Sequence, residues 1–408
     1  MAEPAARGLT CGALHHFFGY YDKCPWDRSG RYVLAMEVGF MDRPPRADDS
    51  VTIGLVDTAA NDAWCPVAET TAWCWQQGTM LQWLGSAPDR LVVYNARRAD
   101  GYASTVLDVH SGARRHLPLP VYAVRRDGRA AVSVNYARLG VTRPGYGYNG
   151  LPDPFQNELH PAGDGITWMD LETGDHRLIV SLDQVVAVRP QASMAGVKHW
   201  FNHLQFNVDG SRFLFLHRWE AGGGRRFTRL FTSDPEGRDL RCLADHDMTS
   251  HFDWRNAHQV FAWARQHGQG DHYYLFEDRD LTRLEKGEWQ GEARDQDIGE
   301  VTAAPGVRVV GRDLLTEDGH CSFSPDGRWL LTDTYPDRSE SRRTLILYDL
   351  AGDRRVDVGR YYAPPDVTGE IRCDLHPRWS RDGRRVCFDS VHEGSRQMYV
   401  VDVVDLVG

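Results

Sequence analysis

One motif recurs seven times along the chain, and this repeat limits the possible folds more than any other feature of the sequence. Each copy has an aromatic or apolar residue at its fourth position, then an Asp-Gly turn or a close relative, and then an apolar strand. Such turn chemistry is typical of a tight β-hairpin. The copies are KCPWDRSGRYVLAM from Lys23, MLQWLGSAPDRLVVY from Met80, VYAVRRDGRAAVSV from Val121, HLQFNVDGSRFLFL from His203, HFDWRNAHQVFAWA from His251, HCSFSPDGRWLLTD from His320 and HPRWSRDGRRVCFD from His376.

A second pair of strands is expected after each copy, which gives about four short strands per unit. In the fifth unit this pair is expected over residues 272–286. Seven such units without a strong helical segment predict an all-β fold, a seven-bladed β-propeller. The last unit is one strand short, and residues 10–18 are expected to supply it. Pairing of N- and C-terminal strands would then close residues 1–408 into a single domain and protect the sheet edge.

The composition argues against several classes of protein. With 41% hydrophobic and 25% charged residues, this chain of 408 residues has the material for a core and does not fit the disordered class. Its formal net charge of −10 argues against binding to nucleic acid or to a membrane surface. We see no secretory signal pattern, no apolar run of membrane-spanning length, and no CxxC pair among the eight cysteines. A cytoplasmic location is therefore expected.

Histidine dominates one column of the aligned copies. The first motif position is histidine in the last four copies, although only 17 of the 408 residues are histidine. The motif strand is expected to be the inner or next-to-inner strand of its blade, so equivalent positions in neighbouring blades face one region around the central axis. The alternative is a structural tie within each blade, but such a tie should recur in most blades, and the first three copies lack it. The column therefore predicts one shared site containing His203, His251, His320 and His376.

Several imidazoles near a carboxylate are typical of a divalent transition-metal site, for Mn²⁺, Zn²⁺, Fe²⁺ or Ni²⁺. Glu317 lies three residues before His320 and is a candidate oxygen ligand, with a solvated turn as the alternative. Arg218 ends the strand of the fourth copy, and Arg378 follows His376. A guanidinium at either position would hold a substrate carboxylate, or would form a salt bridge between blades.

Three further candidates lie near the same predicted cleft. Tyr136 and Arg138 end the corresponding strand of the third copy, beside an insertion at 138–164 rich in Gly, Pro, Tyr and Asn. Such a composition indicates an ordered surface loop that can border a binding cleft. His16 belongs to the aromatic segment HHFFGYYDKCPW and is placed to reach the axis. Aromatic rings there would stack on sugars or pack between blades.

At these residues the chain resembles the oligogalacturonate lyases and related β-propeller polysaccharide lyases, including ulvan lyases. The resemblance is sharpest at FNHLQFNVDGSRFLFLHR, SHFDWRN and HCSFSPDGRWLLTDTYPD. It implies that His203, in the family's NH-x-QF segment, lies in the catalytic centre. It also implies that His251, in the SH-x-x-W segment, and His320 are metal ligands, with Mn²⁺ as the metal and Zn²⁺ or Ca²⁺ as alternatives.

The chain departs from the family pattern at one cluster. Where the family has Gln-x-x-His-x-His, this chain has Glu317, His320 and Ser322. Serine is a poor substitute for an imidazole ligand, so either the metal is lost or His376 takes the vacant position. The same departure leaves the identity of the sugar open.

The resemblance implies β-elimination on a uronic-acid-containing saccharide, so that the expected partner is an acidic oligosaccharide. His203 is assigned as base or base partner, with Tyr136 as a second catalytic candidate. Arg218 is assigned to stabilise the charge on the substrate carboxylate, while His16, Arg138 and Arg378 are assigned to substrate binding.

Two other functions compete with the lyase. A non-catalytic propeller of the TolB or WD-repeat type would bind a protein or glycan and would need no metal. Another metal-assisted propeller enzyme, such as a lactonase or a phosphate-acting hydrolase, would rely on Asp, Glu and Asn at blade ends rather than on a histidine column. A serine peptidase is disfavoured because the chain contains no G-x-S-x-G motif.

Overall fold

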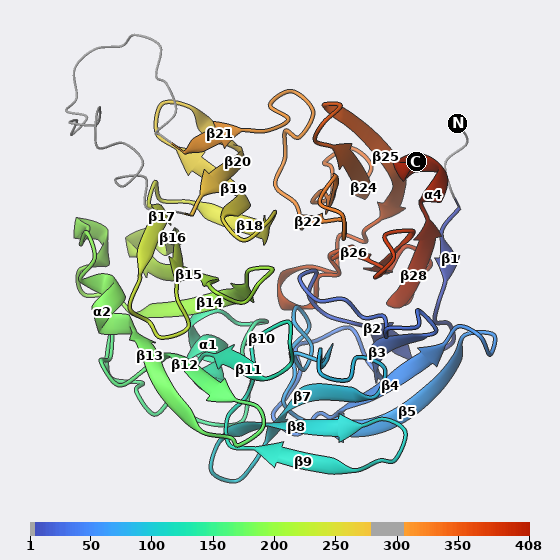
Figure 1. Ribbon diagram of the computed structural model, residues 1–408, viewed down its shortest axis with the longest axis horizontal. Coiled ribbons are helices and arrows are strands. Elements are labelled where there is room, and N and C mark those ends of the chain that lie inside the picture. Colours follow the sequence, from blue (N-terminus) through green and yellow to red (C-terminus); the bar gives the residue numbers. More distant parts are fainter. Residues whose placement is uncertain (1–4, 279–305) are drawn as a thin grey trace.

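The computed structural model describes residues 5–278 and 306–408, and these form seven four-stranded antiparallel sheets arranged in a ring (Figure 1). The seven-bladed β-propeller predicted from the repeat is therefore confirmed. In each of the first six blades the chain starts at the inner strand and runs outward.

The blades follow one another in chain order. The first contains β2 (His15–Phe17), β3 (Tyr32–Val38), β4 (Val51–Asp57) and β5 (Ala63–Thr70). The second contains β6 (Gln82–Trp83), β7 (Leu91–Arg97), β8 (Tyr102–Asp108) and β9 (Arg114–Leu117). The third contains β10 (Ala123–Val124), β11 (Ala130–Ser133), β12 (Gly165–Asp170) and β13 (His176–Ser181). The fourth contains β14 (His199–Phe206), β15 (Phe213–Ala221), β16 (Arg225–Ser233) and β17 (Arg241–Ala244).

The remaining blades repeat this order. The fifth contains β18 (Thr249–Trp254), β19 (Gln259–Gln266), β20 (Gly270–Glu277) and β21 (Val307–Val309). Residues 279–286, the end of the strand pair expected in this unit, lie outside the described residues. The sixth contains β22 (Ser322–Phe323), β23 (Trp329–Asp333), β24 (Arg342–Asp349) and β25 (Arg354–Tyr362). The seventh contains β26 (Arg378–Trp379), β27 (Arg385–Ser390) and β28 (Gln397–Asp402).

Short helices occupy several connections between strands, and one follows the last strand. They are α1 (Tyr136–Thr142), α2 (Leu182–Val186), α4 (Val404–Val407) and the 3₁₀ turns η1 (Ala192–Met194), η2 (Gly222–Gly224) and η3 (Gly369–Ile371). The insertion expected to be a loop in the third unit thus begins with α1, which is capped by the Asn135 side chain accepting from the Arg138 amide. None of the helices in the described ranges is long and apolar enough to cross a membrane.

The seventh blade is completed by the N-terminus. Strand β1 (Arg7–Gly8) pairs with β28, with Arg7 opposite Val400 and Gly8 opposite Tyr399. The closing strand therefore precedes residues 10–18, the segment expected to supply it. A turn through Gly12, at a φ of 108°, redirects the chain after β1, so that residues 15–17 become the inner strand of the first blade instead. Figure 1 shows the two chain ends on the same side of the ring.

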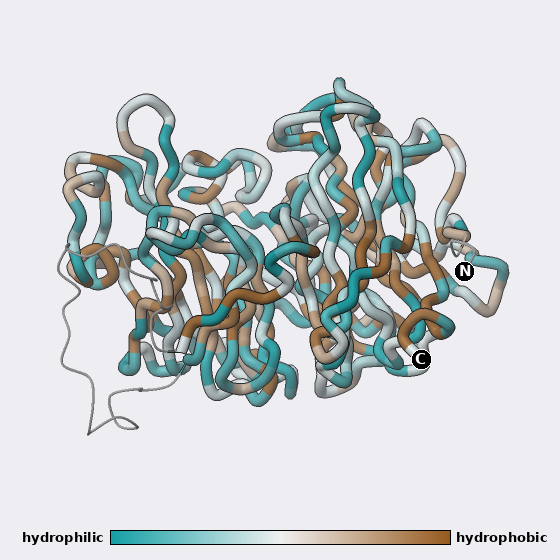
Figure 2. The backbone as a smooth tube through the Cα atoms, turned by 90° about the horizontal axis from the view of Figure 1, so that it is seen from above, coloured by the Kyte–Doolittle hydropathy of each residue, from teal (hydrophilic) through white to brown (hydrophobic). Residues whose placement is uncertain are grey.

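The aromatic residue at the fourth motif position ties neighbouring blades together. The indole Nε1 of Trp83 donates to the carbonyl of Pro25 at 2.8 Å, and that of Trp254 donates to Gln205 at 3.2 Å. Trp379 donates to Ser322 in the same way, at 3.3 Å. Each acceptor occupies the third motif position of the preceding blade. The three rings are buried. Figure 2 shows hydrophobic segments of the backbone at mid-height, between more hydrophilic loops.

The inner strands are irregular where the histidine column begins. The register of β14 against β15 shifts between Asn202 and Gln205, and that of β18 against β19 shifts between Thr249 and Phe252. His203 and His376 also have positive φ angles, of 56° and 42°. Bulges and unusual backbone angles of this kind re-aim a side chain out of the sheet pattern. They turn the first motif residue toward the ring centre.

Candidate functional site

The four histidines of the predicted column meet at the centre of the ring. The ring centres of His251 and His320 are 4.1 Å apart, and those of His320 and His376 are 4.3 Å apart. The Tyr20 ring joins His203 to this group, because it stacks on His203 at 4.8 Å and meets His376 at 4.9 Å. Each of the four histidines is at most 5% exposed. The four imidazoles lie on the inner strands of the fourth to seventh blades or just before them, and they form one buried cluster.

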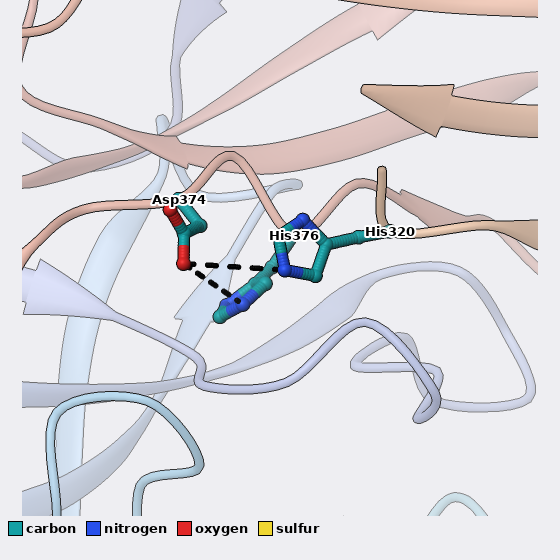
Figure 3. Close-up of side chains that lie close together, drawn as sticks. All are labelled: His320, Asp374 and His376. Carbon is teal, nitrogen blue, oxygen red and sulfur yellow. Dashed lines mark ion pairs between the residues drawn. The ribbon is translucent and has the colours of Figure 1, made fainter. Parts of the chain in front are cut away.

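Two of these imidazoles, His320 and His376, lie beside Asp374 (Figure 3), and hydrogen bonds to other residues fix their tautomers. His320 donates from Nδ1 to Asp333, with Oδ1 at 2.8 Å, and His376 donates from Nδ1 to the carbonyl oxygen of Gly19 at 2.7 Å. A ring whose Nδ1 carries the proton keeps a lone pair on Nε2. Neither Nε2 has a hydrogen-bond partner among the described residues. The two Nε2 atoms lie 3.9 Å and 3.8 Å from the same oxygen, Oδ2 of Asp374.

Asp374 carries the negative charge of this cluster. Its Oδ2 accepts from Arg372 Nε at 2.7 Å, and its Oδ1 lies 2.8 Å from Arg343 Nη2. Burial alone would raise the pKa of Asp374, but Arg372 and Arg343 hold that pKa well below its usual range. Burial and the neighbouring His320 lower the pKa of His376. Asp374 is thus a carboxylate, and His376 is neutral and able to act as a ligand.

His251 has a carboxylate partner of its own. Its Nδ1 lies 2.9 Å from Oδ1 of Asp318. Burial lowers the pKa of His251, while the charge of Asp318 opposes that shift. The predicted oxygen ligand Glu317 is instead exposed, and its neighbour Asp318 faces the cluster. Ser322, at the position where the family has a histidine, has a buried Oγ without a hydrogen-bond partner in the described ranges.

The cluster suits a divalent metal ion. The donor atoms of His320, Asp374 and His376 lie within 4.8 Å of one another. Imidazole and carboxylate groups are ligands that first-row transition metals accept. Asp333 and the Gly19 carbonyl supply the outer hydrogen bonds that orient ligating histidines in metal sites. His251 adjoins this set through His320.

An insertion from the first blade forms one wall of the site. Between β2 and Trp26 the chain leaves the sheet, and Tyr20 and Tyr21 reach across the ring centre. The Tyr21 hydroxyl donates to the carbonyl of Phe252 in the fifth blade at 2.9 Å and accepts from its amide at 3.0 Å. Arg378 holds the same insertion from the seventh blade, donating to the Tyr20 carbonyl at 3.1 Å while it forms a two-pronged ion pair with Asp389. We call residues 18–22 the central insertion.

His203 lies between the central insertion and an arginine. Its Nδ1 lies 3.3 Å from both Gln77 Nε2 and the Tyr122 hydroxyl, and its Nε2 lies 3.4 Å from the Tyr20 hydroxyl. Burial, and next the positive charge of Arg218, lower the pKa of His203 well below its usual value. His203 is therefore a neutral imidazole at neutral pH, which is the form that accepts a proton.

Arg218 is buried without an anionic partner. It is 6% exposed, and its guanidinium makes no hydrogen bond or ion pair with any described residue. Burial, and then repulsion from Arg143, lower its pKa from 12.5 to about 10. Arg143 stacks over the Tyr146 ring at 4.8 Å, and Tyr146 meets the His203 ring at 5.3 Å. A concentration of positive charge thus faces His203, and it suits an anionic ligand.

Three predicted residues lie away from the histidines. Tyr136 is buried in the core, where it donates to the Val121 carbonyl at 3.0 Å and stacks on Tyr148 at 4.3 Å. Arg138 is fully occupied by Asp153 and by backbone carbonyls, including that of His199 at 2.8 Å. His16 faces the seam between the first and last blades, where it contacts Gln397 Oε1 at 3.1 Å and Glu37 Oε2 at 3.0 Å.

Several residues at the site were not predicted from the sequence. Asp374 precedes His376 by two residues, and alternate residues of an extended segment share a face, so this spacing was an available signal. Asp333 ends β23, and its pairing with His320 depends on the hairpin register. No local signal marks Arg372 or Tyr146, which lie 226 residues apart in the sequence and are joined by a hydrogen bond.

Solved structures of similar fold include two oligogalacturonate lyases. The enzyme from Vibrio parahaemolyticus has 13% identity and a TM-score of 0.64, and the match covers 97% of this chain and 93% of that one. An oligogalacturonate lyase in complex with manganese has 15% identity and a TM-score of 0.66, with 98% and 93% covered. The tricorn protease, with 13% identity and a TM-score of 0.53, matches 97% of this chain over 34% of its own length. These likenesses show a shared propeller fold.

The sequence itself matches no protein-family model and no curated protein. The resemblance to oligogalacturonate lyases is therefore supported at the level of the fold, over nearly the whole length of both chains.

Proposed function

We propose that the protein is a lyase that cleaves a uronic-acid-containing oligosaccharide by β-elimination. The observation that carries this proposal is one buried centre containing a neutral histidine, an arginine without a counter-ion, and two imidazoles whose free Nε2 atoms face a carboxylate. The full-length likeness to oligogalacturonate lyases, one of them in complex with manganese, supports the same assignment.

β-Elimination needs a base, a charge stabiliser and a protonated leaving group. In the proposed reaction His203 takes the proton from C5, next to the uronate carboxylate. The electron pair of the C5–H bond forms the C4–C5 double bond, and the C4–O bond breaks. The departing oxygen takes a proton from water. Arg218 pairs with the carboxylate and stabilises the negative charge that develops as the C5 proton leaves.

His320, His376 and Asp374 would hold a divalent metal ion, with Mn²⁺ as the first candidate and His251 beside it. When bound, such an ion would neutralise carboxylate charge on the substrate. The three rings of Tyr20, Tyr21 and Tyr146 would enclose the sugar and limit water near the reacting atoms. The proposal also includes action as a single domain in the cytoplasm, which agrees with eight free cysteines.

The test is incubation with a panel of uronate oligosaccharides and Mn²⁺, followed by ultraviolet absorbance of the unsaturated product. We expect product from at least one substrate, and none from the His203→Gln variant under the same conditions. Binding of a uronate without product, equal in wild type and variant, would replace the lyase with a glycan-binding propeller. Absence of both binding and product across the panel would reject the uronate assignment.

A further inference from the structure

Arg372 connects the proposed metal ligands to the side of the site that contains Arg218 and Arg143. Its Nε donates to Asp374 Oδ2 at 2.7 Å, and its Nη2 donates to the Tyr146 hydroxyl at 2.5 Å. Tyr146 in turn lies 5.3 Å from the His203 ring. One guanidinium therefore touches both the carboxylate between His320 and His376 and the side chain that borders the proposed sugar position.

The oxygen that Arg372 contacts is the one that faces both histidines. Asp374 Oδ2 lies 3.9 Å and 3.8 Å from the Nε2 atoms of His320 and His376, the two separations dashed in Figure 3. A divalent cation held by these three residues would share this oxygen with the Arg372 guanidinium. Two cations close together in a buried site repel each other strongly, because the low dielectric screens them little. The cation and the Arg372–Asp374 ion pair therefore compete.

Arg343 does not have this double role. It approaches the other oxygen, Oδ1, at 2.8 Å, and its Nη1 lies 3.5 Å from the Thr334 carbonyl. It makes no hydrogen bond to Tyr146 within the part of the chain that the structure describes. Arg343 therefore holds Asp374 in place, whereas Arg372 contacts both Asp374 and Tyr146.

We propose that Arg372 couples the binding of a divalent cation to the binding of a uronate carboxylate at this centre. A cation weakens the hold of Asp374 on Arg372 and leaves the guanidinium available to an anion beside Tyr146. An anion bound there draws Arg372 away from Asp374 and frees Oδ2 for the cation. Each ligand then tightens the other by the same factor, as linkage requires. This inference rests on the proposed function, since it takes the anion to be the substrate's carboxylate.

The experiment is calorimetric titration of Mn²⁺ into the metal-stripped full-length protein, with and without saturating D-galacturonate. This monosaccharide has the carboxylate but no glycosidic bond to eliminate, so binding is measured without turnover. We expect galacturonate to lower the Mn²⁺ dissociation constant at least ~5-fold, the lower end of typical coupling between sites. The reverse titration should give the same factor.

Variants separate Arg372 from its neighbours. Arg372→Gln should bind Mn²⁺ more tightly than wild type without the sugar, and galacturonate should then change its affinity less than twofold, well under the ~5-fold coupling expected of wild type. Arg143→Gln, which removes a cation that stacks on Tyr146 but does not touch Asp374, should leave sugar-free Mn²⁺ affinity unchanged. If Arg372→Gln does not fold, Arg372→Lys, which keeps the charge but not the planar fork, should show reduced coupling.

Equal Mn²⁺ affinity with and without galacturonate in wild type would overturn the inference, as would full coupling in Arg372→Gln. So would failure of the stripped protein to bind Mn²⁺ at all. The proposed function fails by a different result, which is the absence of unsaturated product from every uronate tested.

Discussion

Replacing Arg218 by methionine should stabilise the fold and abolish activity. The side chain is 6% exposed and has no partner among the described residues. Each tenfold change in proton affinity is worth about 1.4 kcal/mol, so a pKa lowered from 12.5 to about 10 corresponds to a cost of about 3 kcal/mol for the buried charge. Methionine keeps an unbranched apolar stem and removes that charge. The free energy of unfolding should therefore rise by up to about 3 kcal/mol.

Thermal unfolding measures this change directly. Unfolding entropy near 60 °C is about 2.1 cal/mol/K per residue, so for a chain of 408 residues 3 kcal/mol corresponds to a rise in Tm of roughly 3 to 4 °C. Uronate turnover should fall below detection in the same variant. Galacturonate should also raise the Tm of wild type, because it supplies the missing counter-ion, and should raise the Tm of Arg218→Met less.

Arg138→Met is the matched control. Arg138 is equally buried but pairs with Asp153 at 3.2 Å and donates to several carbonyls. Removing it leaves a buried carboxylate uncompensated, which should destabilise the protein by about 3 to 5 kcal/mol. If Arg218→Met lowered the Tm as Arg138→Met does, the Arg218 guanidinium would be a structural group, and its proposed pairing with substrate would lose its physical basis.

Three further predictions concern other parts of the site and the fold. His203→Gln should reduce uronate turnover at least ~100-fold, measured as product absorbance, because it removes the proposed base, while circular dichroism stays unchanged. Asp333→Asn should weaken Mn²⁺ binding roughly 10- to 100-fold in calorimetry, because His320 loses the carboxylate that fixes its tautomer. Burial lowers the pKa of His199 to about 4, below the unfolded value of 6.5, so the unfolded chain takes up the proton first as pH falls. The free energy of unfolding, measured in urea, should thus be constant above pH 6.5 and decline between pH 6.5 and 4. In His199→Phe this decline should be smaller by up to about 3 kcal/mol.

The fold was predictable because its signal is local and repeated. A hairpin turn and the residues around it lie within fifteen positions, so each blade's central strands can be recognised from one stretch of sequence. The tryptophans at the fourth position carry a second signal, since Trp83, Trp254 and Trp379 bond to the preceding blade from equivalent positions. The closing strand β1 could not be predicted in this way, because two residues, Arg7 and Gly8, are too few to show a pattern.

The site was only partly predictable, and the difference follows from how each residue reaches the centre. His203, His251, His320 and His376 arrive by symmetry, from equivalent positions in adjacent blades, so alignment of the repeats finds them. Tyr136 and Arg138 also follow the repeat, but α1 turns the chain there and directs both side chains into the core and the insertion. A position in the repeat therefore predicts that a side chain reaches the ring centre only where the chain continues as a strand.

Other site residues come from segments that do not follow the sevenfold repeat. The first three blades place Lys23, Met80 and Val121 in the column, so none of these positions offers an imidazole; Lys23 pairs with Asp22 at 2.8 Å, and Met80 and Val121 are buried apolar side chains. The central insertion fills the space that their missing imidazoles leave. It supplies the Gly19 carbonyl that fixes the tautomer of His376, and the Tyr20 ring that stacks on His203.

The site at the centre of this symmetric ring is therefore asymmetric. The imidazoles come from four consecutive blades, and the other three blades contribute the central insertion together with Gln77, Tyr122 and Tyr146, which surround His203. The Arg378–Asp389 ion pair holds that insertion in place across the seam where the chain ends meet. Geometry at His376 therefore depends on closure of the ring, because the Gly19 carbonyl belongs to the first blade and the imidazole to the last. Loosening the N-terminal strand should disturb the donor cluster before it unfolds any blade, since the hydrogen bond across the seam has no substitute within the seventh blade.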